Sequence, residues 1–210
     1  MNNESLLPVA GGYLDTYVKQ AKMEARRVSN PAWMKSFFTE FSTKLQRRKD
    51  EERRSIGDRY IVTRPFAEAF GHLLPAGAKW DTEQPLSKYV SETDIKRFPL
   101  LKRKRVDFSV RRGEALLLIE FKTNLSFNDI SAAIAEMHLV KKYATSNRLH
   151  TAVLFLYPAS GNIDMFIELN KIMGSALDAI WVLGRGTKAS YIYDLKAFEK
   201  MHDDINNFLL

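Results

Sequence analysis

The stretch Ala115-Leu116-Leu117-Leu118-Ile119-Glu120-Phe121-Lys122 decides the fold of this chain. It is apolar with one interruption and has the length of a strand, so it predicts a buried, central β-strand. Just before it, residues 106–110 alternate between apolar and polar, and residues 112–113, Arg-Gly, provide a turn. The two segments together predict a β-hairpin whose second strand is central in the sheet.

The segments after this hairpin alternate between helical and strand patterns. The expected elements are a helix capped by residues 126–128 and reaching about Thr145, a buried strand over 151–157, a helix over 166–179, short strands over 180–183 and 191–193, and a last helix from its cap Asp194 to about Leu210. Gly184-Arg185-Gly186 is expected to turn the chain. This alternation predicts an α/β fold with a mixed sheet.

The part of the chain before the hairpin is mainly helical in pattern. Helices are expected over residues 14–27, from Pro31 to about Arg48, and over residues 64–74, the last closed by residues 75–77, Pro-Ala-Gly. Residues 80–93 are polar and irregular, and predict a loop-rich connection. Because no linker or repeat interrupts the chain, residues 1–210 are expected to form one domain. Its parts would be a helical N-terminal part (1–58), a catalytic core (60–160) and a C-terminal α/β part (161–210).

Composition excludes several classes of protein. The 210 residues are 45% hydrophobic and 27% charged, which is ordinary for a globular domain and excludes collagen and intrinsic disorder. There is no cysteine, so disulfides, thiolate metal sites and cysteine nucleophiles are excluded. The chain has no basic N-terminal region followed by a long apolar one, and no apolar run of about 20 residues. We therefore expect a soluble, cytoplasmic protein without a membrane partner.

Positive charge is concentrated in the first half of the chain. Residues 1–112 contain 23 Lys and Arg against 14 Asp and Glu, whereas residues 113–210 contain 9 against 11, and the whole chain carries +7. The densest cluster is Lys96, Arg97, Lys102, Arg103, Lys104, Arg105, Arg111 and Arg112. It has two open interpretations, a surface that contacts nucleic-acid phosphates and a surface that only confers solubility.

Two carboxylates and a lysine are predicted to meet at the end of the central strand. Glu120 and Lys122 are two residues apart and therefore point to the same face of the strand, and Asp107 lies on the neighbouring strand. Neighbouring carboxylates repel each other unless a cation lies between them, and hard oxygen ligands favour Mg²⁺ or Mn²⁺. Lys122 could then neutralise a bound phosphodiester and orient or deprotonate the attacking water.

The spacing alone is not specific, because three acid-x-lysine triplets occur where about two are expected by chance. Asp94-Ile95-Lys96, with Asp81 upstream, lies in a polar stretch and fits a loop or a helix cap. Asp194-Leu195-Lys196 begins the last helix and is explained by capping. Only Glu120-Phe121-Lys122 combines an apolar strand, an acid on the preceding strand and a basic approach. A buried ion pair remains the alternative to a metal site there.

These residues resemble the PD-(D/E)XK nucleases, a superfamily that includes most type II restriction endonucleases, Holliday-junction resolvases and several repair nucleases. The resemblance covers about residues 60–160, with Val106 in place of the proline that names the motif. It implies a restriction-endonuclease-like αβββαβ core, Asp107 and Glu120 as Mg²⁺ ligands and Lys122 as the catalytic lysine. Many members add a glutamate from a preceding helix, for which Glu68 is the candidate, although solvent exposure of Glu68 is the alternative. Glu136 could hydrogen-bond Lys122 or face water.

The function that this resemblance implies is hydrolysis of phosphodiester bonds in double-stranded DNA by a Mg²⁺-dependent endonuclease, in which Mn²⁺ can substitute. A site-specific type II restriction enzyme acting as a homodimer fits, since one site cuts one strand and a palindrome needs two. The residues expected to contact nucleic acid are Lys102, Arg103, Lys104, Arg105 and Asn124. The alternatives are a junction or repair nuclease, and a non-catalytic nucleic-acid-binding protein with a nuclease-like fold.

Overall fold

The computed structural model describes residues 67, 70–71, 74–122, 127–155, 163–185 and 192–210. Two compact units divide the chain, Met1–Leu74 and Pro75–Leu210. In the first unit, residues 67, 70 and 71 are helical, in agreement with the helix expected over residues 64–74. The helices expected over residues 14–27 and 31–48 lie outside the described residues. The arrangement as one domain therefore stays a prediction.

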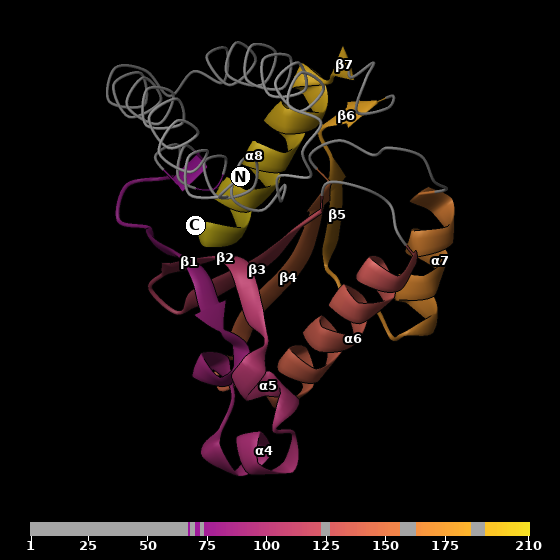
Figure 1. The fold of residues 1–210 in the computed structure, drawn as a ribbon. Helices are drawn as coiled ribbons and strands as arrows, with labels where there is room; N and C mark the ends of the chain where they lie inside the picture. Colours follow the sequence, from indigo (N-terminus) through magenta and orange to yellow (C-terminus); the bar gives the residue numbers. More distant parts are fainter. Residues whose placement is uncertain (1–66, 68–69, 72–73, 123–126, 156–162, 186–191) are drawn as a thin grey trace, which may run out of the picture. The chain divides into compact units, whose positions relative to one another are not determined.

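A five-stranded mixed sheet forms the centre of the second unit, in the order β1-β2-β3-β4-β5 (Figure 1). The strands are β1 (Lys79–Pro85), β2 (Arg105–Arg112), β3 (Ala115–Lys122), β4 (Arg148–Phe155) and β5 (Ala179–Val182). β1, β2 and β3 are antiparallel neighbours, whereas β3, β4 and β5 run parallel to one another. The predicted α/β class, the mixed sheet and the central β3 are confirmed.

Helices connect the parallel strands and follow the last one. They are α6 (Phe127–Tyr143) between β3 and β4, α7 (Ile163–Ile172) between β4 and β5, and α8 (Leu195–Leu209) at the C-terminus. The side chain of Asp194 accepts a hydrogen bond from the Ala197 amide at 3.1 Å, which confirms the predicted cap of the last helix. Within the described part of the chain, no helix is long and apolar enough to cross a membrane.

The two faces of the sheet are covered by different helices, and this determines which side chains of β3 can form a site. Leu116 and Leu118 share a buried cluster with residues of α6. On the opposite face, the rings of His150 and Phe208 lie 4.5 Å apart, which places α8 there. Because side chains alternate along a strand, Glu120 and Lys122 lie on the face that α6 covers.

Residues 80–93 are not the loop-rich connection that their polarity predicts. They hold most of β1, the 3-10 helix η3 (Leu86–Tyr89) and the start of α4 (Glu92–Arg97), which is followed by α5 (Leu100–Arg103). β1 is an edge strand, so its polar side chains can remain partly exposed and no continuous apolar run is needed. It is anchored by the Trp80 ring, 5.7 Å from the ring of Phe108.

The segment around α7 also differs from its prediction. α7 begins at Ile163 and ends at Ile172, seven residues before the expected end at residue 179. The chain leaves the helix because Gly174 and Ser175 take φ values of 73° and 53°. Of the three residues expected to turn the chain, Gly184 and Arg185 form β6 (Gly184–Arg185), which pairs with β7 (Ile192–Tyr193), and Gly186 lies outside the described residues. A pairing partner several residues away therefore outweighed the local turn signal.

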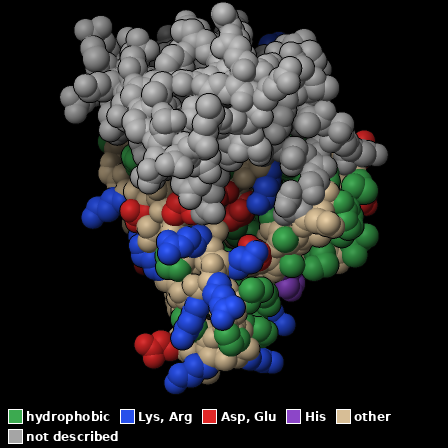
Figure 2. Space-filling model, viewed as in Figure 1, with side chains coloured by type: hydrophobic (Ala, Val, Ile, Leu, Met, Phe, Trp, Pro, Cys, Tyr) green, Lys and Arg blue, Asp and Glu red, His purple; other side chains and the backbone are tan. Residues whose placement is uncertain are grey.

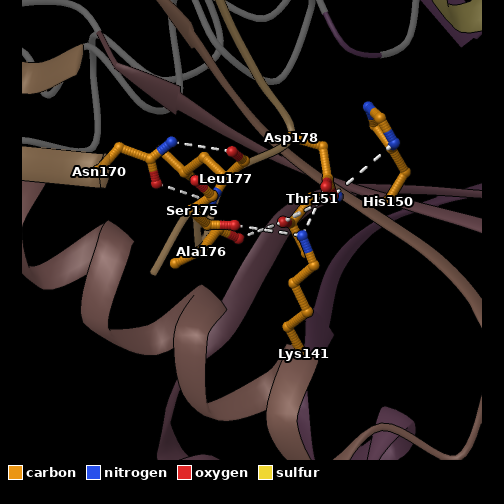
Figure 3. Close-up of polar contacts among 8 residues, drawn as sticks. All are labelled: Lys141, His150, Thr151, Asn170, Ser175, Ala176, Leu177 and Asp178. Atoms are coloured by element: carbon orange, nitrogen blue, oxygen red, sulfur yellow. Dashed lines mark hydrogen bonds and ion pairs between the residues drawn. The ribbon is translucent and has the colours of Figure 1, made fainter. Parts of the chain in front are cut away.

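A group of polar side chains ties α6, β4 and the α7–β5 connection together (Figure 3). Asp178 Oδ2 accepts from the Thr151 amide at 2.9 Å, and Asp178 Oδ1 accepts from Lys141 Nζ at 2.5 Å. The Thr151 hydroxyl donates to the Ala176 carbonyl at 2.6 Å. These bonds fix the connection to β4, at the opposite end of α6 from the start that follows β3.

Candidate active site

β2 and β3 separate at one end of the hairpin, and this separation positions the candidate site. Their pairing extends from the turn to Phe108 and Ile119. Beyond that point β2 continues beside β1, while β3 continues beside β4. The diverging strand ends carry all three residues that the sequence singles out, Asp107, Glu120 and Lys122.

Asp107 is the first residue of β2 beyond this pairing, so the antiparallel register puts it across from Glu120. Its Oδ2 accepts a hydrogen bond from the Phe121 amide at 2.8 Å. The side chain thus satisfies an amide at the point where the β2–β3 ladder ends. This bond holds the Asp107 carboxylate against the end of β3.

Glu120 is buried beside Lys122. The residue is only 5% exposed, and Lys122 Nζ lies 3.1 Å from Glu120 Oε2. The other oxygen, Glu120 Oε1, is buried and has no hydrogen-bond partner within the described residues. A buried carboxylate oxygen without a partner is unfavourable. This oxygen is therefore a position where a bound cation or a hydrogen-bond donor would be stabilised.

The protonation of these groups is shifted by burial and by one another. Burial, followed by the negative charge of Asp107, raises the pKa of Glu120 to about 8, against the opposing effect of Lys122. For Lys122, burial is the largest single effect and lowers the pKa. The carboxylates of Glu120 and Asp107 more than offset it, so the pKa of Lys122 lies above its usual value. Lys122 is therefore positively charged, and the carboxyl groups of Glu120 and Asp107 stabilise that charge.

Glu136 of α6 adds a third carboxylate near this group. It is 9% exposed, and its Oε1 lies 2.5 Å from Lys104 Nζ, so it neither faces water nor bonds Lys122, the two roles considered from the sequence. Its charge nevertheless acts on both Glu120 and Lys122. Local sequence patterns do not reveal the Lys104–Glu136 pair, because its members lie 32 positions apart and on different elements.

The predicted nucleic-acid contacts divide into two kinds. Lys102 and Arg103 are exposed on α5. Lys104 pairs with Glu136, and Arg105 donates to the Glu83 carbonyl at 2.9 Å. Figure 2 shows Lys and Arg side chains gathered over the part of the second unit that contains α4 and α5, with acidic side chains close by. The second unit thus presents a basic surface next to an acidic group.

Asp107 and Glu120 fit a hard divalent cation better than a zinc-type site. No three Asp, Glu, His or Cys side chains in the described ranges are grouped so that they could hold a metal together. Mg²⁺ commonly takes one or two protein carboxylates and completes its shell with water and substrate oxygens. Glu120 Oε1, which has no hydrogen-bond partner in the described ranges, supplies a ligand atom of the required kind. The residues that could hold such an ion are therefore Asp107 and Glu120.

The other candidates lie elsewhere. Glu68 and Asn124 fall outside the described residues. Asp94 lies in the first turn of α4, where its amide donates to the Ser91 hydroxyl, and Asp194 caps α8. Both competing triplets thus belong to helix starts, as expected.

No known protein-family model matches the chain, and no curated protein sequence matches it. Any function for this protein is therefore inferred from the chemistry of its own residues. The described chemistry is a group of carboxylates and a lysine at diverging strand ends, beside a basic surface.

Proposed function

We propose that this protein is a Mg²⁺-dependent endonuclease that hydrolyses phosphodiester bonds in double-stranded DNA. The observation that carries the proposal is the gathering of Asp107, Glu120 and Lys122 where β2 separates from β3, with the buried Glu120 Oε1 lacking a partner among the residues that the structure describes. An ion pair with a purely structural role would be better served by two partnered carboxylate oxygens.

Each residue has a distinct role in this proposal. Asp107 and Glu120 would bind the divalent cation, and the bond from the Phe121 amide keeps Asp107 oriented for it. The cation, when bound, supplies Lewis-acid activation and stabilises developing charge. Lys122 would neutralise the scissile phosphate and orient the attacking water, because its ammonium is held beside Glu120 rather than exposed.

The order of the elements supports the family resemblance. An antiparallel β1-β2-β3 sheet, then α6, then β4 parallel to β3 agrees with the αβββαβ core that the resemblance implies. We further propose a site-specific type II restriction enzyme that acts as a homodimer, since cutting both strands of a palindrome requires two such sites. Exposed Lys102 and Arg103 would contact DNA phosphates.

The first prediction tests activity directly. Purified full-length protein with Mg²⁺ should cut double-stranded DNA, and Mn²⁺ should substitute. Ca²⁺ should support binding with little cleavage, because it holds its ligands loosely. Gel analysis and sequencing of the fragment ends measure the outcome.

The products also distinguish the alternatives. Discrete fragments with one end sequence indicate a restriction enzyme, whereas cleavage confined to branched substrates indicates a junction nuclease. Binding without cleavage under any of these metals would contradict the enzyme proposal and favour a binding protein.

A further inference from the structure

Lys104 is held at the edge of the candidate site by its backbone as well as its side chain. Its amide donates to the Leu100 carbonyl at 3.1 Å, and its carbonyl accepts from the Leu86 amide at 2.9 Å. From this fixed point its ammonium reaches Glu136 Oε1 at 2.5 Å. The side chain of Lys104 remains 42% exposed, whereas that of Glu136 is 12% exposed. The ion pair therefore stabilises mainly the buried Glu136 carboxylate, because Lys104 is still partly solvated.

Glu136 would compete for Lys122 if Lys104 were absent. Its negative charge already acts on Lys122, whose ammonium is hydrogen-bonded to Glu120. A carboxylate that is largely buried and left without its partner draws the nearest available cation toward it. Because a catalytic ammonium must be held within a fraction of an ångström to be effective, such a competition would disturb the reaction.

We propose that Lys104 is a positioning residue of the site, whose ammonium holds Glu136 so that Lys122 stays on Glu120. This role replaces the phosphate contact predicted for Lys104 from the sequence. It rests on the proposed nuclease function, which supplies the reaction to be measured. It also requires that the effect of Lys104 depends on the charge of Glu136, and this dependence can be measured.

The test compares Lys104→Met, Glu136→Gln and the double variant in the full-length protein with Mg²⁺. At saturating DNA, Lys104→Met should lower kcat by at least about tenfold, while the Kd for DNA in EDTA changes by less than about threefold. Glu136→Gln and the double variant should have similar kcat values, both above that of Lys104→Met. Adding Glu136→Gln to Lys104→Met thus restores activity, because no unpaired charge remains at position 136 to draw Lys122 away from Glu120.

A matched control is available on the same helix. Lys141→Met removes another 2.5 Å ion pair, to Asp178, on α6 but away from the site (Figure 3). It should lower the thermal midpoint and leave kcat unchanged. An equal loss of kcat in Lys141→Met would show that loss of any such pair is damaging and would overturn the positioning role.

Other outcomes separate this proposal from the proposed function. If wild-type protein cleaves and Lys104→Met cleaves equally well, or the double variant is as slow as Lys104→Met, only the positioning role is overturned. If Lys104→Met loses DNA affinity in EDTA with unchanged kcat, Lys104 contacts phosphate, and the positioning role is again overturned. Wild-type protein that cleaves no DNA with any metal overturns the proposed function, and the positioning role fails with it.

Discussion

At Glu120, burial and the negative charge of Asp107 act in the same direction, and Lys122 opposes both. The carboxyl is nearly inaccessible and has Asp107 as a neighbour on the adjoining strand. One of its oxygens bonds Lys122, and the other has no partner in the described part of the chain. Its raised pKa follows from these contacts. The same contacts lead to a prediction about stability and to a prediction about DNA binding.

The stability of the metal-free protein should depend on pH through Glu120. Its folded pKa is about 8, against 4.5 as the ordinary value, so the folded state holds a proton that the unfolded state releases between these values. The contribution of Glu120 is therefore present below about pH 4.5 and is lost as pH rises through 8. We expect wild type to lose stability relative to Glu120→Gln over this window, as measured by urea unfolding in EDTA at several pH values. A constant difference would contradict the raised pKa.

The three site residues should differ in the sign of their effect on DNA binding. Without metal, Asp107 repels a phosphate and Glu120 does so only where it has lost its proton, whereas Lys122 attracts the phosphate. Glu120→Ala and Asp107→Ala should therefore abolish cleavage and yet bind DNA in EDTA at least as tightly as wild type. Lys122→Ala should also abolish cleavage, with equal or weaker binding. Titration of one labelled duplex, with circular dichroism to show folding, gives the comparison.

The control for these variants is Asp194→Ala, which removes the cap of α8. It should cost about 1 kcal/mol of stability and keep cleaving. A folded but inactive Asp194→Ala, or an active Glu120→Ala, would mean that the site is built on a different acid-x-lysine triplet.

Among the elements, α6 is the one that joins the candidate site to the rest of the sheet. It carries Glu136, which faces Lys104, and Lys141, which faces Asp178 directly before β5. Asp178 is a single carboxylate that accepts from two donors, the Thr151 amide and Lys141 Nζ. Because Thr151 is fully buried, water cannot replace Asp178 as the hydrogen-bond acceptor of its amide.

Asp178→Ala should therefore be among the more destabilising substitutions of a partly exposed acid. We expect a loss of roughly 3 kcal/mol, from an unsatisfied buried amide and an unpaired Lys141. Glu199→Ala, on an exposed position of α8, should change stability by less than about 0.5 kcal/mol. Chemical denaturation of the three proteins measures both values. An equal effect of the two substitutions would show that the Asp178 bonds contribute little.

On the scale of the whole molecule, charge is separated along the chain. The sequence carries its positive excess before residue 113, and the described part of that excess includes the exposed side chains of α4 and α5. Such a surface would bind a polyanion through phosphates and release counterions as it does so. Its contribution should therefore depend on salt and not on base sequence.

Substituting Lys102 and Arg103 together with alanine should weaken DNA binding and flatten its salt dependence. If each side chain contacts one phosphate, the slope of log K against log salt should decrease by up to about two units. The preferred cleavage sequence should stay the same. Binding measured by fluorescence anisotropy at several salt concentrations gives the slope. An unchanged slope would mean that this surface confers only solubility.

The sequence alone was sufficient to predict the elements whose own residues carry the signal. The apolar run of β3, the alternation in β2, the helix α6 and the Asp194 cap all depend on neighbours within a few positions, because burial of one face imposes a period on the chain. The prediction of Asp107, Glu120 and Lys122 as neighbours followed from the same hairpin. Their proximity needed only the turn between two adjacent strands.

Tertiary structure decided what depends on partners distant in the sequence. The mostly polar residues 79–85 form a strand only because they pair with β2. Gly184 and Arg185 form a strand because they pair with β7. β2 separates from β3 because β2 continues beside β1 while β3 continues beside β4. At this separation the Phe121 amide donates to the Asp107 carboxylate. Lys104 pairs with Glu136 because α6 packs back over the sheet. Local periodicity records how each segment is buried, but pairing energies between segments appear only once the chain has folded.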